Sequence, residues 1–431
     1  MLTEIKKNDR YGQEKIDALL AREGIRRDKN LDYSCGIFDD NYNLIATGSC
    51  YKNTIRCTGV SEDHQGEGLL NQVMTHLMTI QAERGNAHVF VYTKPESALF
   101  FSDIGFCEIV RTERVVFMEN RKDGLRDWIR GLEDGALPDF EDPHQRTDKA
   151  DHVNEDVLED EIKGAETTDE VNGDSGAVGA IVMNAAPFTK GHRYLIEKAA
   201  RDVAYAASRD GGATEYERRG SVAGNGTGLL HLFIVREEAG PVPFDVRQRL
   251  VMDGTRDIPN IIYHDTGNYL ISSATFPAYF LRDEDDAVKA QAEVDVKVFS
   301  LIAEKLGITR RYVGDEPYSR TTQIYNSVME ELLPGAGVEC RVIPRLSIGS
   351  EKEGAECLSE RNASRIEILG EGGKEGVERP VSASIVRQAI HDGDMAAVEE
   401  MLPEVTIEFL RSPEGEDVIR AIREEDDVWH Y

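Results

Sequence analysis

The chain has 431 residues, of which 40% are hydrophobic, so it is long enough to form two or three domains with sizeable cores. Eighty acidic residues against 50 Lys and Arg give a formal net charge of -30, which argues against a general nucleic-acid-binding surface. Six cysteines without C-x-x-C or zinc spacing, and the lack of a signal core or a membrane-length apolar run, predict a soluble cytoplasmic protein with no metal ligands.

A first domain is expected over residues 1–136. Residues 35–48 have the pattern of a hairpin that turns at residues 40–43, and a further strand at residues 54–60 leads into a polar loop. A helix with Leu69, Val73, Leu77 and Ile80 on one face follows, and then a strand, a short helix and another strand. This order of elements resembles a GNAT-type acetyltransferase, which implies a GNAT-like α/β fold.

The polar loop at residues 63–68, D-H-Q-G-E-G, lies where the GNAT family has [QR]-x-x-G-x-[GA]. In that family the loop binds the pyrophosphate of coenzyme A through backbone N–H groups at the start of a helix. Gly66 and Gly68 match the pattern, but Asp63 stands in place of Gln or Arg and Glu67 adds a second negative charge. The resemblance therefore implies weakened coenzyme A binding, and it leaves open whether this domain is an active acyl site or only positions a partner.

An acidic segment is expected to separate two domains. Residues 139–174 contain 14 Asp or Glu against three Lys or Arg, with few apolar residues and no periodicity. Such a segment cannot bury enough surface to offset its ordering entropy, so residues 137–175 are predicted to form a flexible linker, with an acidic docking segment as the alternative. Residues 208–228 and 350–379 are Gly-rich and charged, which predicts two exposed loops.

A second domain is expected over residues 176–431, and it begins with the most informative run of the chain. An apolar strand at residues 177–183 leads into N-A-A-P-F-T-K-G-H at residues 184–192, and a helical pattern follows. A strand, a tight loop and a helix N-terminus place backbone N–H groups where an anion binds. His192 can donate to a phosphate oxygen there, and Thr189 offers a hydroxyl. The run resembles the T/H-x-G-H motif of the nucleotidyltransferase superfamily.

Three later segments match the same superfamily in the expected order. The first is P-F-D-V-R-Q-R at residues 243–249, after an apolar strand at residues 229–235. The second is V-G-D-E-P at residues 313–317, which closes a strand that begins near Arg310. The third is V-S-A-S-I-V-R at residues 381–387, which opens a late helix and resembles the signature I-S-x-[ST]-x-[VI]-[RK]. The resemblance implies a Rossmann-like, doubly wound parallel sheet.

A GNAT-like domain followed by a T-x-G-H domain resembles the citrate lyase ligase family. Two long strings carry this resemblance further, N-Y-L-I-S-S-A-T-F-P-A-Y-F-L at residues 268–281 and G-D-E-P-Y-S-R-T-T-Q-I-Y-N at residues 314–326. Members of that family use ATP to acetylate the thiol of a coenzyme-A-like prosthetic group on citrate lyase. The resemblance implies ATP with Mg²⁺ as cofactors, acetyl adenylate as intermediate, AMP and pyrophosphate as products, and acetate and the acyl carrier subunit of the lyase as partners.

The motifs also imply roles for single residues. His192, Thr189 and Asn184 are expected to contact the phosphates or the incoming carboxylate, and Gly191 to permit close backbone approach. The residues expected to hold the rest of the nucleotide are Ser382, Ser384 and Arg387 at the β- and γ-phosphates, Gly314 and Asp315 near the adenosine, and Lys190 as electrostatic help.

Two groups of residues have weaker implied roles. One of Arg247 and Arg249 is expected to support the site, and Arg249 is the one placed among the nucleotide-binding residues. The side chains that could line an acetate or pantetheine pocket are Ser272, Ser273, Thr275 and Tyr279. The alternative is that Phe276, Tyr279 and Phe280 belong to the core, which is the ordinary place for such aromatic residues.

Two other functions remain open from the sequence. One is a cofactor-synthesis adenylyltransferase that acts on a phosphopantetheine or a mononucleotide, and the other is a regulatory partner of the lyase without turnover. The adenylyltransferase does not account for the acetyltransferase-like domain. The regulatory partner does not account for the intact set of Thr189, His192, Ser384 and Arg387. Pyrophosphate release that depends on acetate, rather than on a phosphorylated acceptor, separates the ligase from the adenylyltransferase.

Overall fold

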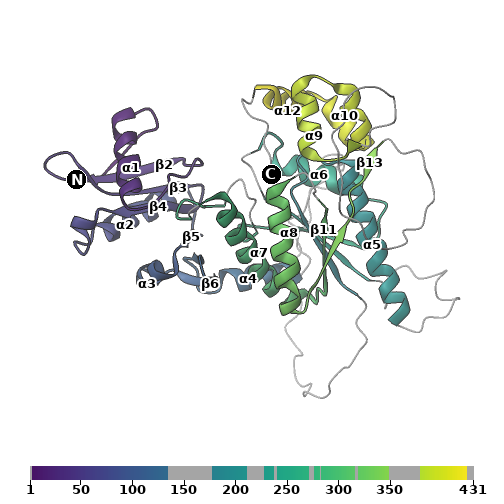
Figure 1. Ribbon diagram of the computed structural model, residues 1–431, viewed down its shortest axis with the longest axis horizontal. Helices are drawn as coiled ribbons and strands as arrows, with labels where there is room; N and C mark the ends of the chain where they lie inside the picture. The colour runs from purple at the N-terminus through teal and green to yellow at the C-terminus, as the bar shows by residue number, and fades with distance from the viewer. Residues whose placement is uncertain are drawn as a thin grey trace, which may run out of the picture.

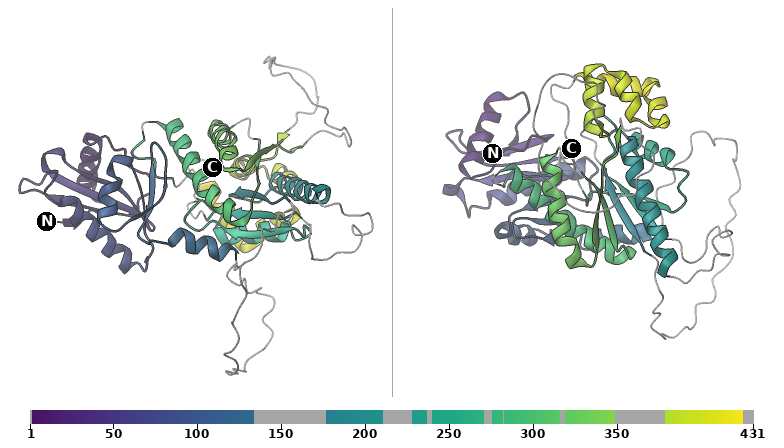
Figure 2. Two further views of the ribbon diagram at one scale, coloured as in Figure 1. Left: turned by 90° about the horizontal axis from the view of Figure 1, so that it is seen from below. Right: turned by 45° about the vertical axis from the view of Figure 1, so that its right-hand side comes forward.

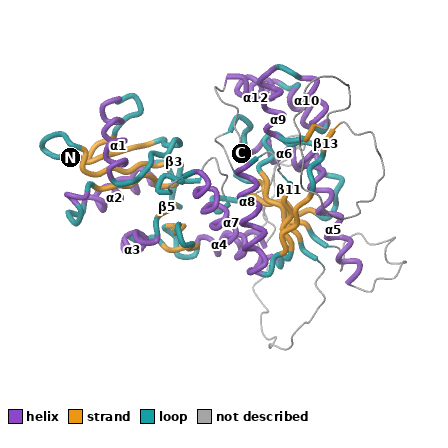
Figure 3. The backbone as a smooth tube through the Cα atoms, in the orientation of Figure 1, coloured by secondary structure: helices purple, strands orange, loops and turns teal. Residues whose placement is uncertain are grey.

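The computed structural model describes residues 2–133, 177–210, 228–236, 240–270, 276–281, 283–315, 319–348 and 379–424. Two β-sheets form its framework, a seven-stranded mixed sheet and a five-stranded parallel sheet (Figure 3). The predicted fold class is therefore confirmed. The acidic segment at residues 137–175 and the centres of the two Gly-rich loops lie outside the described residues.

The first sheet has the strand arrangement expected for a GNAT-like domain. Its order is β1 (Leu2–Glu4), β2 (Tyr33–Phe38), β3 (Leu44–Tyr51), β4 (Thr54–Val60), β5 (Phe90–Thr93), β7 (Val116–Glu119) and β6 (Cys107–Arg111). All neighbours are antiparallel except β4 and β5, which run parallel. These two strands pair only at Thr54↔Phe90 and Ile55↔Val91, so they diverge toward their carboxyl ends.

Helices cover both faces of the first sheet. The helix α2 (Leu69–Glu83) buries Leu69, Val73 and Leu77 on one face, together with α3 (Ala98–Asp103). The apolar stripe expected from the sequence is therefore present at these positions. The helices α1 (Arg10–Arg22) and α4 (Gly124–Glu133) pack in the core of the opposite face.

The second sheet is parallel throughout. Its order is β10 (Ile261–Asp265), β9 (Leu230–Ile234), β8 (Gly179–Met183), β11 (Arg310–Gly314) and β12 (Glu339–Ile343). The short apolar runs of β8 and β9 suit a sheet that is buried on both faces. The strand order reverses between β8 and β11, and this switch point is where open α/β sheets bind their ligands, beyond the carboxyl ends of the strands.

The helices of the second domain divide between the two faces of this sheet (Figure 1). The helices α5 (Lys190–Asp210) and α6 (Phe244–Gly254) share one core with β8 and β9, whereas α7 (Glu284–Leu306) packs on the other face and contacts α8 (Arg320–Leu332). The pair β13 (Ser347–Ile348) and β14 (Arg379–Pro380) leads into a final group of helices. These are α9 (Ala383–Asp392), α10 (Met395–Met401), α11 (Glu404–Leu410) and α12 (Pro413–Glu424), which cluster at one end of the molecule (Figure 2).

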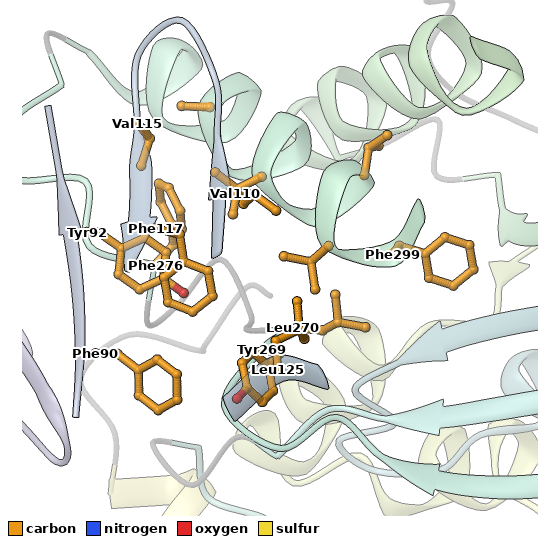
Figure 4. Close-up of a cluster of buried hydrophobic side chains, with 14 of the residues drawn as sticks. Phe90, Tyr92, Val110, Val115, Phe117, Leu125, Tyr269, Leu270, Phe276 and Phe299 are labelled. Atoms are coloured by element: carbon orange, nitrogen blue, oxygen red, sulfur yellow. The ribbon is translucent and has the colours of Figure 1, made fainter. Parts of the chain in front are cut away.

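One hydrophobic core joins the two domains. Figure 4 shows Phe90, Tyr92 and Phe117 of the first sheet beside Tyr269 and Phe276 of the second domain. Between the two sheets, α7 contacts both β6 and α4. The Tyr269 hydroxyl donates to Glu119 Oε2 at 2.9 Å, and the Tyr279 hydroxyl donates to the Tyr92 carbonyl at 3.0 Å. The sequence interpretation of two domains connected by a linker did not include this shared core.

The helices of the described ranges differ from membrane spans in length or in apolar character. None of them combines sufficient length with sufficient apolar character to cross a bilayer.

Candidate active site

A cavity of about 320 Å³ opens at the switch point of the parallel sheet. The segments that line it include the loop from β8 to α5, the end of β11, the residues that follow β12, and the first turn of α9. Three of them come from the T-x-G-H, V-G-D-E-P and V-S-A-S-I-V-R motifs. The fold therefore brings together side chains that are about 200 positions apart in the sequence.

The geometry of the loop fixes the tautomer of His192. The Thr189 backbone N–H donates to His192 Nδ1 at 3.1 Å, and the Thr189 hydroxyl lies 3.0 Å from the same nitrogen. Because Nδ1 accepts these bonds, the proton of the neutral ring resides on Nε2. The imidazole stacks on Phe188 with a centroid distance of 6.1 Å. His192 thus presents one N–H donor, in a fixed orientation, at the start of α5.

The environment keeps the His192 ring neutral. Burial lowers the pKa of His192 to about 4, and the nearby positive charges of Arg345 and Arg387 act in the same direction. Burial also lowers the pKa of Arg345, against the opposing effect of Asp315. The cavity is therefore rich in cationic groups and hydrogen-bond donors around a neutral imidazole, and such a set is complementary to a polyanion.

A buried guanidinium holds the loop in place. Arg247 of α6 is 1% exposed, and its Nη1 donates to the backbone oxygen and the Oδ1 of Asn184, both at 2.6 Å. The same side chain donates to the carbonyls of Val235 and Val242. Arg247 is absent from the cavity lining, so it acts on Asn184 from behind. The Asn184 Nδ2 atom is buried without a partner among the described residues, which leaves its N–H groups available to a ligand.

The first turn of α9 closes the cavity from the other side. The Ser382 hydroxyl caps the helix by accepting from the Ile385 N–H at 3.1 Å. The Arg387 guanidinium is 1% exposed, donates to the Ala186 carbonyl, and lies 3.4 Å from the Ser384 hydroxyl. A Cβ on Gly191 would lie 2.8 Å from the Val381 carbonyl, so only glycine permits this approach of α5 and α9.

The structure brings most of the expected site residues to one cavity. Those that line it are Asn184, Thr189, Gly191, His192, Gly314, Asp315, Ser382, Ser384 and Arg387.

Two of the expected residues lie elsewhere. The Lys190 ammonium donates to the Glu400 carbonyl on an exposed surface. Arg249 pairs with Glu414 of α12 at 2.8 Å and does not line the cavity. Within α6 it is the neighbouring arginine, Arg247, that supports the loop, because its position on the helix faces the sheet whereas Arg249 faces outward. The residues Ser272, Ser273 and Thr275 lie outside the described part of the chain.

Sequence reasoning missed several residues of this cavity. Arg345 lies two residues after the end of β12, and a basic residue near the carboxyl end of a parallel strand was a usable signal once the strand had been identified. The side chains from α8 are Thr321, Thr322, Tyr325, Asn326 and Met329. Their position depends on how α8 packs on the sheet, which the helical period alone does not give.

The donor set fits a nucleoside triphosphate better than a resident metal. Hydroxyls, helix N–H groups and two arginines suit phosphate oxygens. Among the residues that the structure describes, no cluster of three His, Cys, Asp or Glu side chains could hold a metal ion. A divalent ion that arrives with phosphates needs few protein ligands, and Asp315 is a carboxylate that lines the cavity.

A second cavity, of about 600 Å³, lies between the first sheet and the second domain. Its walls include the diverging ends of β4 and β5, the glycine loop, Phe100 of α3, and Tyr279 and Phe280 of the second domain. Tyr279 and Phe280 are 8% and 9% exposed, so the core interpretation of these aromatic residues holds, and both also line this cavity.

The glycine loop of the first domain has the geometry of an anion-binding turn. Gly66 and Gly68 have φ values of 86° and 73°, and Gly68 precedes the first residue of α2. Both glycines line the second cavity, together with His64 and Gln65. Asp63 and Glu67 are exposed and absent from the lining, so their charges act on a ligand only through solvent.

The chain was compared with known families and curated proteins. Residues 178–207 and 221–370 match the model of the citrate lyase ligase C-terminal domain. The chain is 29% identical to the [citrate [pro-3S]-lyase] ligase of Escherichia coli over 96% of this chain and 94% of that protein. It is 28% identical to the protein of the same name from Haemophilus influenzae, over 92% of this chain and 94% of that protein. It is also 28% identical to the one from Klebsiella pneumoniae, over 93% of each chain.

Two of the solved structures that match this chain each cover 28% of it. A putative acyl-CoA N-acyltransferase from Klebsiella pneumoniae is 15% identical, with 28% of this chain and 94% of that chain covered and a TM-score of 0.23. ElaA from Escherichia coli is 14% identical, with 28% of this chain and 99% of that chain covered and a TM-score of 0.25.

Proposed function

We propose that this chain is a member of the citrate lyase ligase family and that it uses ATP to acetylate the thiol of the prosthetic group on citrate lyase. The matching C-terminal domain and the three curated relatives support this proposal. The acetylated lyase is the active form in this proposal. The reaction proceeds through acetyl adenylate, and AMP and pyrophosphate are the products. The observation that carries the proposal is the convergence of His192, Arg345, Arg387 and the α9 hydroxyls around one cavity at the switch point of the sheet.

The first half-reaction needs positioning and charge neutralisation. An oxygen of acetate attacks the α-phosphorus of ATP, the bond from that phosphorus to the bridging oxygen breaks, and pyrophosphate leaves. No proton moves, because acetate is already an anion. His192 Nε2–H donates to a phosphate oxygen, and Arg345 and Arg387 neutralise the charge that accumulates on the leaving group. Gly191 lets the N-terminus of α5 approach the same oxygens.

The second half-reaction transfers the acetyl group to sulfur. The thiolate attacks the carbonyl carbon of acetyl adenylate, a thioester forms, and the bond from that carbon to the phosphate oxygen breaks with release of AMP. No protein nucleophile is required, since the adenylate is already activated. The residues that bind AMP in the first step serve as the leaving-group site in the second.

The second cavity is proposed to receive the pantetheine-like arm of the prosthetic group. The diverging strands β4 and β5 leave backbone groups of residues 58–60 and 92–94 unpaired with each other, and an extended amide chain can bond to such groups. Covalent attachment of the arm to the lyase supplies a high local concentration, which offsets the acidic residues near the glycine loop.

Pyrophosphate exchange tests the first half-reaction. The full chain is incubated with ATP, labelled pyrophosphate and acetate, and in parallel with 4′-phosphopantetheine or nicotinamide mononucleotide in place of acetate. We expect exchange that depends on acetate. Exchange that depends on a phosphorylated acceptor instead would establish an adenylyltransferase, and no exchange with any acceptor would establish a regulatory partner without turnover.

A cavity-filling variant tests the second half-reaction in the full chain. Val60→Trp places a large side chain in the second cavity, and Leu99→Trp at an exposed position outside the lining is the matched control. Val60→Trp should leave acetate-dependent exchange unchanged and lower acetylation of the lyase at least about tenfold. Equal acetylation rates for both variants would remove the second cavity from the transfer step.

A further inference from the structure

One end of the site cavity contains a buried ion pair that the phosphate chemistry does not use. Arg311 of β11 is 2% exposed, and its Nη2 lies 2.8 Å from Oδ2 of Asp295 on α7. Both side chains line the same cavity as His192. Arg311 and Val313 alternate along the strand with Tyr312, so they face α7 and α8, on the side of the sheet away from α5.

The guanidinium of Arg311 is only partly satisfied. Its Nε and Nη1 atoms are buried and have no hydrogen-bond partner among the described residues. Asp295 accepts a second bond, from the Tyr325 hydroxyl at 2.5 Å, so its charge is shared between two donors. A buried donor without a partner costs free energy, and a buried charged group costs more. A ligand oxygen would remove this cost.

The surroundings of Arg311 select the size and charge of that ligand. The Arg311 guanidinium lies over the Phe299 ring, 4.4 Å from its centroid. The lining of the cavity also includes the apolar side chains of Val182, Leu270, Val313 and Met329 and the buried amide of Gln291. The Arg311–Asp295 pair has no net charge, so it attracts a polyphosphate weakly, and Arg345 and Arg387 already serve the phosphates. Buried N–H donors without a partner beside an apolar wall suit a small monoanion with a short hydrocarbon part.

We propose that Arg311, braced by Asp295, binds the carboxylate of the acyl donor, a short-chain monocarboxylate, at the α7–α8 end of the cavity. The inference rests on the proposed function, since it assigns a binding position to the carboxylic acid that reacts with ATP in that function. The carboxylate enters as a monoanion and accepts from one of the two buried, unpartnered nitrogens of Arg311, Nε or Nη1. Val182 and Leu270 contact its alkyl group, so an unbranched two-carbon acid fits better than a polar or dianionic one.

A paired neutral replacement tests the proposal without leaving an uncompensated buried charge. Arg311→Gln is combined with Asp295→Asn in one chain, and Arg311→Lys is made separately because it keeps the charge and loses the planar donor pair. Arg310→Gln is the matched control, since Arg310 is the preceding residue of β11 and pairs with Glu339 and Asp202 on the other face of the sheet. Thermal unfolding verifies that each variant folds.

The measurement is acetate-dependent pyrophosphate exchange together with direct calorimetric binding of ATP. The double variant should raise the KM for acetate by roughly 10- to 100-fold, the scale for losing charge-assisted hydrogen bonds, with ATP binding changed less than about twofold. Arg311→Lys should lie between the double variant and the wild type, and Arg310→Gln should match the wild type. In the wild-type chain, acetamide should fail to compete with acetate.

The outcomes separate this inference from the proposed function. Lack of acetate-dependent exchange in the wild-type chain would overturn the proposed function itself. Wild-type exchange together with an unchanged acetate KM in both Arg311 variants would overturn the assignment of Arg311 alone. A parallel loss of ATP and acetate binding, or competition by acetamide, would also overturn it, because Arg311 would then support the fold and would not recognise the carboxylate.

Discussion

The side chains around the loop after β8 divide into those that face the cavity and those that hold the loop. His192 and Asn184 belong to the first group, and Arg247 belongs to the second. The motif spacing predicted the first group, because a strand–loop–helix junction has few possible geometries. It did not separate Arg247 from Arg249, because which arginine faces inward depends on how α6 packs, and both positions carry the same residue type.

His192 provides the sharpest test at this scale. An Asn side chain can still accept the Thr189 N–H but has no donor at the position of Nε2, whereas Gln can place a donor there. His192→Asn should therefore lower acetyl-adenylate formation by roughly two to four orders of magnitude, and His192→Gln should lower it less. His391→Ala on the exposed part of α9 is the control. Pyrophosphate exchange measures all three, and near-normal exchange by His192→Asn would exclude His192 from the mechanism.

Arg247 and Arg249 should differ in their contributions to folding. Arg247→Met leaves the carbonyls of Asn184, Val235 and Val242 without their buried donor, so we expect a loss of about 3 kcal/mol or more in unfolding free energy. Arg249→Met removes one exposed ion pair with Glu414 and should cost less than about 1 kcal/mol. Urea denaturation compares the two variants, and equal losses would contradict the division drawn above.

A buried histidine pair should make stability depend on pH. His231 Nδ1 and His264 Nε2 lie 2.7 Å apart, and burial lowers their pKa values to about 4 and about 3. Below about pH 6.5 the unfolded chain binds protons that the folded chain does not, so stability falls with pH until the folded pKa values are reached. Lowering the pH from 7 to 5 should cost about 2 kcal/mol for each histidine. In the double variant His231→Gln, His264→Asn this part of the pH dependence should disappear, as denaturation at several pH values would show.

At the scale of elements, the sequence predicted the type of most helices and strands near the motifs. The apolar runs of β8 and β9, the hairpin of β2 and β3, and the helix that begins after Ser382 all lie where their patterns indicate. Arg345 and the α8 side chains could not be placed in the same way. They reach the cavity only because β11 lies next to β8 and β12 lies next to β11, and strand order is a property of long-range pairing.

The contact between α5 and α9 yields a prediction at this scale. Gly191→Ala places a Cβ 2.8 Å from the Val381 carbonyl, so the first turns of the two helices must move apart. The donors of both helices would then no longer converge on the same phosphates, and ATP binding should weaken at least about tenfold. Gly335→Ala is the control, because a Cβ there meets nothing within 4 Å. Calorimetric titration with ATP distinguishes the two, and equal affinities would show that the cavity tolerates the separation.

At the scale of the whole molecule, the two sheets share a core that composition and linker position could not predict. The aromatic residues of the segment after β10 pack on the first sheet, and Tyr269 contacts Trp128 with a centroid distance of 4.9 Å. Their sequence pattern was compatible with either a pocket or a core. Only the packing of α7 and α4 between the sheets decides in favour of a shared core.

This shared core predicts cooperative unfolding of the described domains. Calorimetry of the full chain should show one transition, and Tyr269→Ala should lower the unfolding free energy by about 3–5 kcal/mol while it keeps a single transition. Hydrogen exchange of β3 and β9 should accelerate together in this variant. Two separate transitions, or acceleration in one sheet alone, would show that the domains unfold independently.

A further consequence concerns motion during turnover. Two residues after β10 border the two cavities, Leu270 the first and Tyr279 the second, and both belong to the shared core. In the proposed reaction the two cavities keep a fixed separation, so the prosthetic group of the lyase has to move from one cavity to the other. The length and stiffness of the prosthetic arm would then govern the turnover rate more than its affinity for either cavity. An arm that is too short to reach both cavities cannot receive the acetyl group.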